Sequence, residues 1–270
     1  PPRLEQGRSV LCLHGAGGNG HLFAELMNQL ETAHTLIAFD LPGHGRSGSL
    51  DSLGSIEAMA EFTDQVLNAL ELESTVLVGH DMGSAIALHC ASTRPARVEG
   101  LVVCSAGQGF SLPDTTVEQM RRVRDGKEKR PFDPAAFSKK TPPDIMKKAF
   151  MEGMKTDPRA TFGDLVAYQQ WNEVDQLSNI TAPTLIVHGT DEREATRASA
   201  AALAEQIQHS QLEKIEDAGH SILMEAPSAL AERIAQVNFT GTLVFCEAAR
   251  KRLRPGGTLC VFSSVAGERG

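Results

Sequence analysis

The segment from Ser74 to Leu88 constrains the fold of this chain more than any other. It runs from β-branched and aliphatic residues through Gly79-His80-Asp81-Met82-Gly83 into helix-forming residues. This order predicts a buried strand, a sharp turn and a helix. The two glycines allow a tight bend beside closely packed backbone, so the residue at the tip can adopt a strained conformation. That tip residue is Asp81, and its identity limits the chemistry available there.

Strands and helices alternate along most of the rest of the chain. Besides the strand before Asp81, strands are expected at residues 9–13, 35–39, 98–104, 183–189 and 211–215. Besides the helix after Asp81, helices are expected at about residues 21–30, 55–70, 195–206 and 227–235. The alternation favours an α/β fold with a mostly parallel central sheet and helices on both faces.

Composition narrows the class of partner. The chain has 270 residues, 41% of them hydrophobic, which is enough for a large core. A net charge of −8 argues against nucleic acid, whose phosphates require a basic face. No apolar run approaches the roughly 20 residues that cross a bilayer, and the start has no signal-peptide pattern. The expected partner is therefore a small-molecule substrate, with no nucleic acid and no membrane, and the oligomeric state is open.

The cysteines indicate a reducing compartment. There are five, at positions 12, 90, 104, 246 and 260, with no C-x-x-C spacing. Four lie within apolar runs, which predicts buried free thiols and a cytoplasmic location. No cluster has the spacing of a zinc site, so neither a metal nor a cofactor is expected.

Residues 106–182 interrupt the alternation. This stretch is rich in charged residues, proline and methionine and is too long for an ordinary loop, so a helical cap is expected there. The expected division of the chain is a core of residues 1–105 and 183–236, the cap at 106–182, and a separate tail at 237–270.

Five motifs together resemble a known family. In order they are His14-Gly15-Ala16-Gly17-Gly18, the turn from Asp40 to Ser47, the bend at Asp81, the pair His188-Gly189, and Gly219-His220. They are similar to the α/β-hydrolase superfamily over about residues 8–236. The resemblance implies the α/β-hydrolase fold and an enzyme, a hydrolase, whose nucleophile, acid and histidine follow one another in that order along the chain.

The resemblance also implies roles for individual residues. Asp81 takes the place of the usual serine nucleophile, and His220 takes the place of the base. The acid falls three residues after Gly189, at Glu192, with Asp191 as the alternative. An oxyanion hole is expected from the backbone N–H groups of Met82 and Ala16. The residues expected to bind substrate are His14, Gly15, Gly17, His80, Tyr168 and Trp171. His44 and Arg46 are expected to be structural.

An aspartate at the bend leaves three hypotheses open. A carboxylate attacks a saturated carbon bearing a leaving group, so Asp81 could open an epoxide or displace a halide through a covalent ester that His220 then helps to hydrolyse. Alternatively, the chain is a serine esterase or C–C hydrolase scaffold whose serine has been replaced, with little activity. The third hypothesis is a non-catalytic protein that binds a small ligand. Epoxide hydrolases and dehalogenases carry an aspartate here, but their proline in the first motif and tryptophan after the aspartate are absent.

Residues 237–270 show a different pattern. They resemble an internal fragment of a short-chain dehydrogenase, with one helix, a Pro-Gly-Gly turn and one strand. The glycine-rich nucleotide loop of that family and its Tyr-x-x-x-Lys pair are missing, so no NAD binding is expected.

Overall fold

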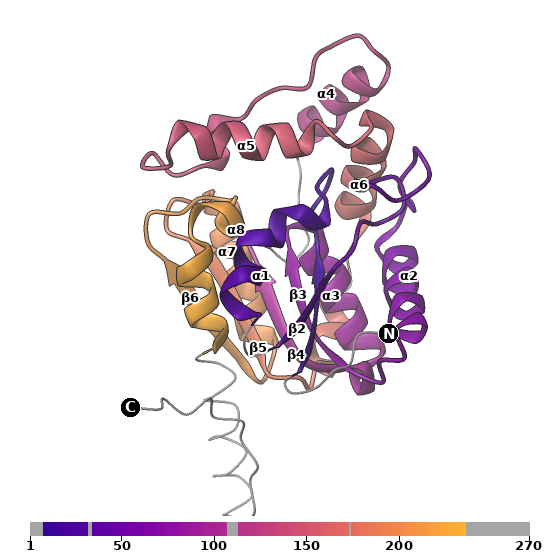
Figure 1. Ribbon diagram of the computed structural model, residues 1–270, viewed down its shortest axis with the longest axis vertical. Helices are drawn as coiled ribbons and strands as arrows, with labels where there is room; N and C mark the ends of the chain where they lie inside the picture. The colour runs from indigo at the N-terminus through magenta and orange to yellow at the C-terminus, as the bar shows by residue number, and fades with distance from the viewer. Residues whose placement is uncertain (1–7, 32–33, 107–112, 173, 236–270) are drawn as a thin grey trace, which may run out of the picture.

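A parallel sheet organises the part of the chain that the structure describes. The computed structural model describes residues 8–31, 34–106, 113–172 and 174–235. Its six strands lie in the order β2-β1-β3-β4-β5-β6, and every neighbouring pair is parallel (Figure 1). Their bounds are β1 Ser9–Leu13, β2 Thr35–Ala38, β3 Thr75–His80, β4 Val98–Cys104, β5 Thr184–Gly189 and β6 Ser210–Ile215.

Side chains alternate between two cores along each strand, because successive residues of a strand point to opposite faces. In β1, Val10 and Cys12 belong to one buried cluster, whereas Leu11 and Leu13 belong to the other. Both faces of the sheet are therefore apolar and must be covered. The mostly parallel sheet with helices that was expected from the sequence is confirmed.

Helices cover both faces. The α-helices are α1 Ala24–Leu30, α2 Ile56–Ala69, α3 Met82–Thr93, α4 Asp114–Arg124, α5 Pro143–Gly153, α6 Pro158–Gln170, α7 Glu194–Gln206 and α8 Ile222–Glu225, and residues 227–235 are also helical. Short 3-10 helices are η1 Gly20–Phe23, η2 Pro95–Arg97, η3 Pro134–Ala136 and η4 Val174–Asn179. Helix α3 packs against β3 and β4, and its burial on all sides explains its almost continuous run of apolar and small residues.

Helices α4, α5 and α6 belong to the long insertion between β4 and β5. In Figure 1 they lie together at one end of the sheet. Their contacts reach η1, α3 and α8 of the remaining chain. The expected boundaries at residues 105 and 183 fall in the segments that join β4 and β5 to the insertion, and as domain limits they stay predictions.

The strand order changes direction between β1 and β3. The chain leaves β1 for β2 on one side and returns to β3 on the other, which makes this pair a topological switch point. Ligands of open α/β sheets bind at the carboxyl ends of the strands beside such a point. Here those ends carry His14 to Gly18 and Asp81, so the topology brings two of the sequence motifs together.

The structure differs from the expected elements in small ways. The helix expected at residues 21–30 divides into η1 and α1, and the short helix α8 was not predicted. Cys12, Cys90 and Cys104 are free and buried, as expected. Within the described ranges, no helix is long and apolar enough to cross a bilayer. The dehydrogenase-like tail lies outside the described residues, as do Cys246 and Cys260.

The glycine after the bend gives a first testable prediction. A Cβ added at Gly83 would lie 2.0 Å from the carbonyl oxygen of Leu13, whereas one at Gly48 would meet nothing within 4 Å. Gly83→Ala is therefore expected to lower the free energy of unfolding by about 3 kcal/mol, because β1 and α3 must separate. Urea unfolding of this variant beside Gly48→Ala checks the expectation, and equal stabilities would contradict it.

Candidate active site

Asp81 occupies a strained bend between β3 and α3. Its backbone has φ 53° and ψ −121°, in the region that residues other than glycine rarely adopt. Its N–H donates to the carbonyl of Cys104 at 3.0 Å, and its carbonyl accepts from Ser84 N–H at 2.9 Å. The Ser84 hydroxyl donates to the carbonyl of Gly79 at 2.8 Å. Ser84 therefore braces the bend from inside the first turn of α3, and Asp81 alone stands at the tip.

The two carboxylate oxygens of Asp81 have different surroundings. The backbone N–H of Ala16 donates to Oδ2 at 3.0 Å. Oδ1 lies 3.7 Å from Nε2 of His220, beyond hydrogen-bond distance. A Cβ at Gly15 would lie 2.7 Å from Oδ2, so a glycine is needed there for the carboxylate to reach the loop.

His220 reaches the bend from the loop after β6. Its Nδ1 lies 2.9 Å from Oε2 of Glu192, and its backbone N–H donates to the carbonyl of Ala136 in the insertion at 2.8 Å. The histidine side chain is 17% exposed and that of Glu192 is fully buried. Because Nδ1 faces a carboxylate, it carries the proton, which leaves Nε2 toward Asp81 as the basic nitrogen.

The geometry selects Glu192 over Asp191 as the partner of His220. Oε1 of Glu192 accepts the N–H of Arg193 at 2.9 Å, which fixes the carboxylate. Asp191 is exposed and accepts the hydroxyl of Ser138 at 2.6 Å. Asp191 therefore ties the insertion to the core and does not contact the histidine.

Burial and the neighbouring charges set the protonation of this group. Burial opposes charge on His220, but the hydrogen bond and charge of Glu192, with a contribution from Asp81, raise its pKa above 6.5. Burial alone would raise the pKa of Glu192, yet the hydrogen bond and charge of His220 outweigh it and lower that pKa. Glu192 is thus ionised, and it favours the protonated form of His220.

Sequence comparison decides the family. A family model described as alpha/beta hydrolase fold matches residues 8–227. The chain belongs to the α/β-hydrolase family. It is 28% identical to the AB hydrolase superfamily protein YisY of Bacillus subtilis (strain 168) over 86% of this chain and 92% of that protein. It is 27% identical to the monoacylglycerol lipase ABHD6 of Homo sapiens, over 84% of this chain and 74% of the lipase.

A solved structure agrees with this family. The esterase EaEST from Exiguobacterium antarcticum superposes with a TM-score of 0.77 at 25% identity, covering 86% of this chain and 92% of the esterase. Relatives of this family are named as hydrolases, and the hydrolase assignment made from the sequence is confirmed at that level.

The expected oxyanion donors of this α/β-hydrolase lie on either side of Asp81. Ala16 N–H contacts Oδ2, as described. Met82 is the first residue of α3, and its N–H is one of the four at a helix start that have no acceptor within the helix. Both remain predictions as parts of an oxyanion hole, and the helix start adds a favourable dipole for a negative charge.

The residues expected to bind substrate lie in different surroundings. His14 is fully buried, with Nδ1 2.9 Å from the carbonyl of Gly15 and Nε2 accepting Leu41 N–H at 3.1 Å. The internal contacts use both nitrogens of His14, and its role in binding substrate stays a prediction. Tyr168 and Trp171 are 0% and 4% exposed in the same apolar cluster as Met82. Their place in the core weighs against direct contact with substrate.

A cavity of about 150 Å³ lies beside the glycine loop, residues 14–18. Its lining residues are Ala16, Gly17, Gly18, Leu22, His80, Ala149, Gly153, Ser221, Leu223 and Met224. Gly17 and His80, both expected near the substrate, are among them. The Nε2 of His80 lies 2.8 Å from the carbonyl of His220, and burial followed by the charge of His220 lowers the pKa of His80. The cavity is small and mostly apolar.

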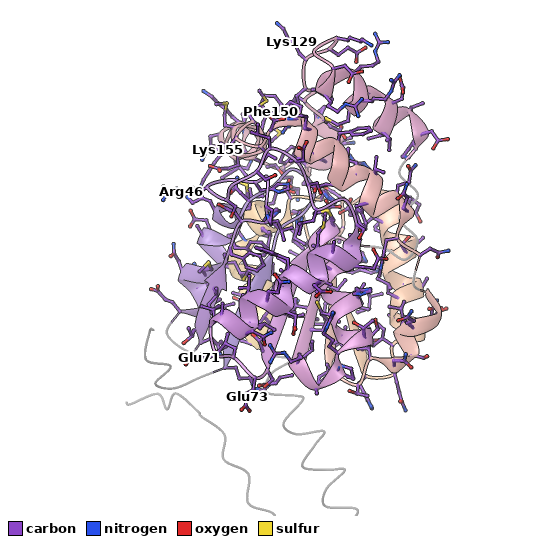
Figure 2. All side chains as sticks on the ribbon, turned by 90° about the vertical axis from the view of Figure 1, so that its right-hand side faces the viewer. Arg46, Glu71, Glu73, Lys129, Phe150 and Lys155 are labelled. Atoms are coloured by element: carbon purple, nitrogen blue, oxygen red, sulfur yellow. The ribbon has the colours of Figure 1, made fainter. Side chains whose placement is uncertain are left out.

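A more polar hollow of about 450 Å³ opens next to this cavity. Arg46 and Lys155 both line it, and Figure 2 shows them on the same side of the molecule. Lys155 pairs with Glu152 at 2.8 Å. Neither this hollow nor the apolar cavity is lined by Asp81 or His220, but the apolar cavity includes Ala16 and His80, which contact them.

One buried carboxylate was missed in the sequence. Asp164 in α6 is fully buried and contacts the glycine loop and His44. The sequence feature that could have identified Asp164 is a carboxylate among apolar positions of a helix, close to Leu165, Ala167 and Tyr168. A charged residue on a buried helix face is rarely there without a partner.

Glu192 provides a prediction for the titration of His220. Glu192→Gln removes the charge that raises the pKa of His220, so that pKa is expected to fall. NMR titration of the histidine ring protons measures it. Asp191→Asn is the matched control because it removes the neighbouring carboxylate, and its effect should be small. Equal shifts in both variants would contradict the assignment of Glu192.

Proposed function

We propose that this hydrolase uses Asp81 as a covalent nucleophile on a small apolar substrate with a carbon–halogen bond or an epoxide. One observation carries the proposal: Oδ2 of Asp81 accepts the Ala16 N–H at 3.0 Å while Oδ1 stands free, 3.7 Å from His220 Nε2. One oxygen is held and the other is available. An ionised carboxylate has no proton to lose, so Oδ1 can attack directly.

The same contact disfavours a carbonyl substrate. An ester must place its carbonyl oxygen against the oxyanion donors, but the Asp81 carboxylate already occupies Ala16 N–H. Attack by a carboxylate on an ester would also form a labile anhydride. A saturated carbon with a leaving group has neither requirement, because the carboxylate displaces the group directly.

The reaction balances in two steps. Oδ1 attacks the carbon, the carbon–halogen bond breaks, and the halide leaves with the bonding electrons, giving an alkyl ester of Asp81. His220 Nε2 then takes a proton from water, whose oxygen attacks the ester carbonyl carbon. The former Oδ2 carries the developing negative charge against Ala16 N–H. Collapse releases the alkoxide, which takes the proton from His220. Asp81 is left as a carboxylic acid that contains the oxygen of water, and it loses its proton to solvent to restore the carboxylate.

A halide fits the described residues better than an epoxide. An epoxide oxygen needs a proton as the ring opens, and the chain's one tyrosine, Tyr168, is fully buried. A halide needs no proton. The cavity of about 150 Å³ beside Ala16 has room for a short alkyl chain, and neither Asp81 nor His220 lines it.

Mass spectrometry tests the proposal. After incubation with n-butyl bromide or propylene oxide, the peptide containing Asp81 is expected to carry the alkyl group. In heavy-oxygen water, completed turnover should transfer the heavy isotope into the Asp81 carboxylate. Asp81→Asn should form no ester. Saturable binding of both compounds with neither ester nor isotope incorporation would contradict the proposal and support a ligand-binding protein.

The named relatives favour a second candidate. The esterase EaEST and the monoacylglycerol lipase suggest an ester-hydrolysing scaffold in which aspartate stands in place of serine. In that case His220 and Glu192 are positioned to activate a serine hydroxyl that is absent at position 81. The free buried thiols Cys12, Cys90 and Cys104 support a cytoplasmic location under either candidate.

A further inference from the structure

A carboxylate from the insertion holds the glycine loop, residues 14–18. Oδ2 of Asp164, in α6, accepts the backbone N–H of Gly17 at 2.9 Å and lies 2.7 Å from Nε2 of His44. The Asp164 and His44 side chains are both fully buried. Figure 1 shows α6 at the same end of the sheet as the other inserted helices, next to α3. The contact therefore joins the insertion to the loop that follows β1.

His44 carries a positive charge in this arrangement. Its Nδ1 lies 3.1 Å from the carbonyl of Pro42, and its Nε2 faces the carboxylate, so both nitrogens face acceptors and both carry protons. Burial opposes the charge, but the hydrogen bond and charge of Asp164 outweigh it, and the pKa of His44 is raised. The adjacent His14, with ring centroids 4.7 Å apart, is neutral, because burial and the charge of His44 lower its pKa to about 4.

Gly17 lies directly against α6. Its φ is +65°, and a Cβ there would lie 2.7 Å from the hydroxyl oxygen of Thr161 in the same helix. The N–H of Gly18 donates to the carbonyl of Gly15 at 3.0 Å and closes the turn. The peptide between Gly15 and Ala16 lies inside this closed turn, and its N–H points to Asp81. A shift of Gly17 must therefore also move the Ala16 N–H.

Holding a loop with a buried carboxylate costs free energy of folding. Removing a charge from water costs several kcal/mol, and apolar replacements of buried ion pairs often stabilise a protein. Oδ1 of Asp164 is also buried with no hydrogen-bond partner among the described residues, which adds to the cost. A contribution to fold stability alone does not explain the Asp164 carboxylate. A role in directing an N–H at the reacting centre does explain it.

We propose that Asp164 is a positioning residue: it holds Gly17, with His44 as its counter-ion, so that the Ala16 N–H stays directed at the Asp81 carboxylate. The inserted helix α6 thereby positions one donor of the expected oxyanion hole. This inference rests on the proposed function for its catalytic consequence. The structural part of the inference, that Asp164 keeps the Ala16 N–H directed at Asp81, does not depend on any substrate.

Two variants and one control test the proposal. Asp164→Ala removes the acceptor, and Asp164→Asn leaves a weaker, neutral acceptor for Gly17. Ala167→Gly, in a buried position of the same helix, destabilises α6 without touching the loop. Hydrogen exchange of the Ala16 and Gly17 amides is followed by NMR in the full chain. Decay of the alkyl ester on Asp81 is followed by mass spectrometry after a pulse of n-butyl bromide.

The expected results are graded. In Asp164→Ala, exchange of the Ala16 amide should be about tenfold faster or more, and decay of the ester should be about a hundredfold slower. Both effects should be smaller in Asp164→Asn. Ala167→Gly should lower the melting temperature and change neither. If Asp164→Ala does not fold, Asp164→Asn decides alone, since unchanged Ala16 exchange in that variant overturns the proposal.

The two readouts separate failure of this inference from failure of the proposed function. Faster Ala16 exchange with no ester in any variant would refute the covalent mechanism and leave the positioning role in place. Ester that forms and decays at the wild-type rate in Asp164→Ala, with Ala16 exchange unchanged, would refute the positioning role alone.

Discussion

Replacing His220 with asparagine is expected to stop the reaction halfway, with an alkyl ester left on Asp81. The first step needs only an ionised carboxylate, and Oδ1 of Asp81 is not hydrogen-bonded to His220 at 3.7 Å. The second step needs a base for water, and His220 Nε2 is the basic nitrogen at that oxygen. Loss of a positioned general base costs up to about ten-thousandfold, so ester decay should slow by roughly a thousandfold while ester formation changes little.

Rapid quenching after a pulse of n-butyl bromide, followed by mass spectrometry of the Asp81 peptide, measures both steps. His209→Asn is the matched control, since His209 is exposed and outside the site. Its ester should form and decay as in the wild type. If the ester decayed equally fast in His220→Asn, water activation by His220 would be wrong, although the nucleophilic role of Asp81 would stand.

The pH dependence follows from the same histidine. Only neutral His220 accepts a proton from water, and Glu192 with Asp81 raises its pKa above 6.5. Ester decay in the wild type should therefore be slow at acidic pH and rise as the pH passes through a value above 6.5. The same pKa shift stabilises the fold below 6.5, and that contribution is lost as the pH rises through the raised pKa. Activity and this part of the stability thus change in opposite directions.

The sequence predicted the fold well because strong local patterns agreed with each other. β1, β3 and β4 are short apolar runs, and each ends at glycines or polar residues that begin a loop. Parallel strands with intervening helices leave few topologies. The bend at Asp81 was also predictable, since glycines on both sides relieve the close packing around a residue with φ of 53°.

The site was only partly predictable, because side-chain direction depends on loops. Glu192 and Asp191 are neighbours, and nothing in their sequence decides which of them meets His220. The structure turns Glu192 inward, while Asp191 pairs with Ser138 of the insertion. Asp164 lies 147 positions from Gly17, and no local spacing could join them. The motifs therefore did not reveal the contacts between the insertion and the core.

Replacing Asp81 with serine is expected to create ester hydrolysis where the wild type has almost none. A serine hydroxyl is shorter than the aspartate carboxylate, so it vacates the position at Ala16 N–H that Oδ2 now fills. An ester carbonyl can then take that donor. His220 and Glu192 are already paired at 2.9 Å, and the basic Nε2 faces the bend, so the added hydroxyl gains a base. A freed oxyanion donor alone contributes about a hundredfold or more.

Hydrolysis of p-nitrophenyl acetate by purified Asp81→Ser, Asp81→Ala and wild-type protein measures this gain. Asp81→Ala frees the same donor without supplying a nucleophile, so the serine variant should exceed it by a large factor, and Asp81→Ser with Glu192→Gln should fall back toward it. A folded serine variant that hydrolyses no ester would show that the bend, the histidine and the loop do not form an esterase site. Because the wild type differs from that variant only at Asp81, ester hydrolysis by Asp81→Ser would mean that the carboxylate at Ala16 N–H is what keeps an otherwise complete site from hydrolysing esters.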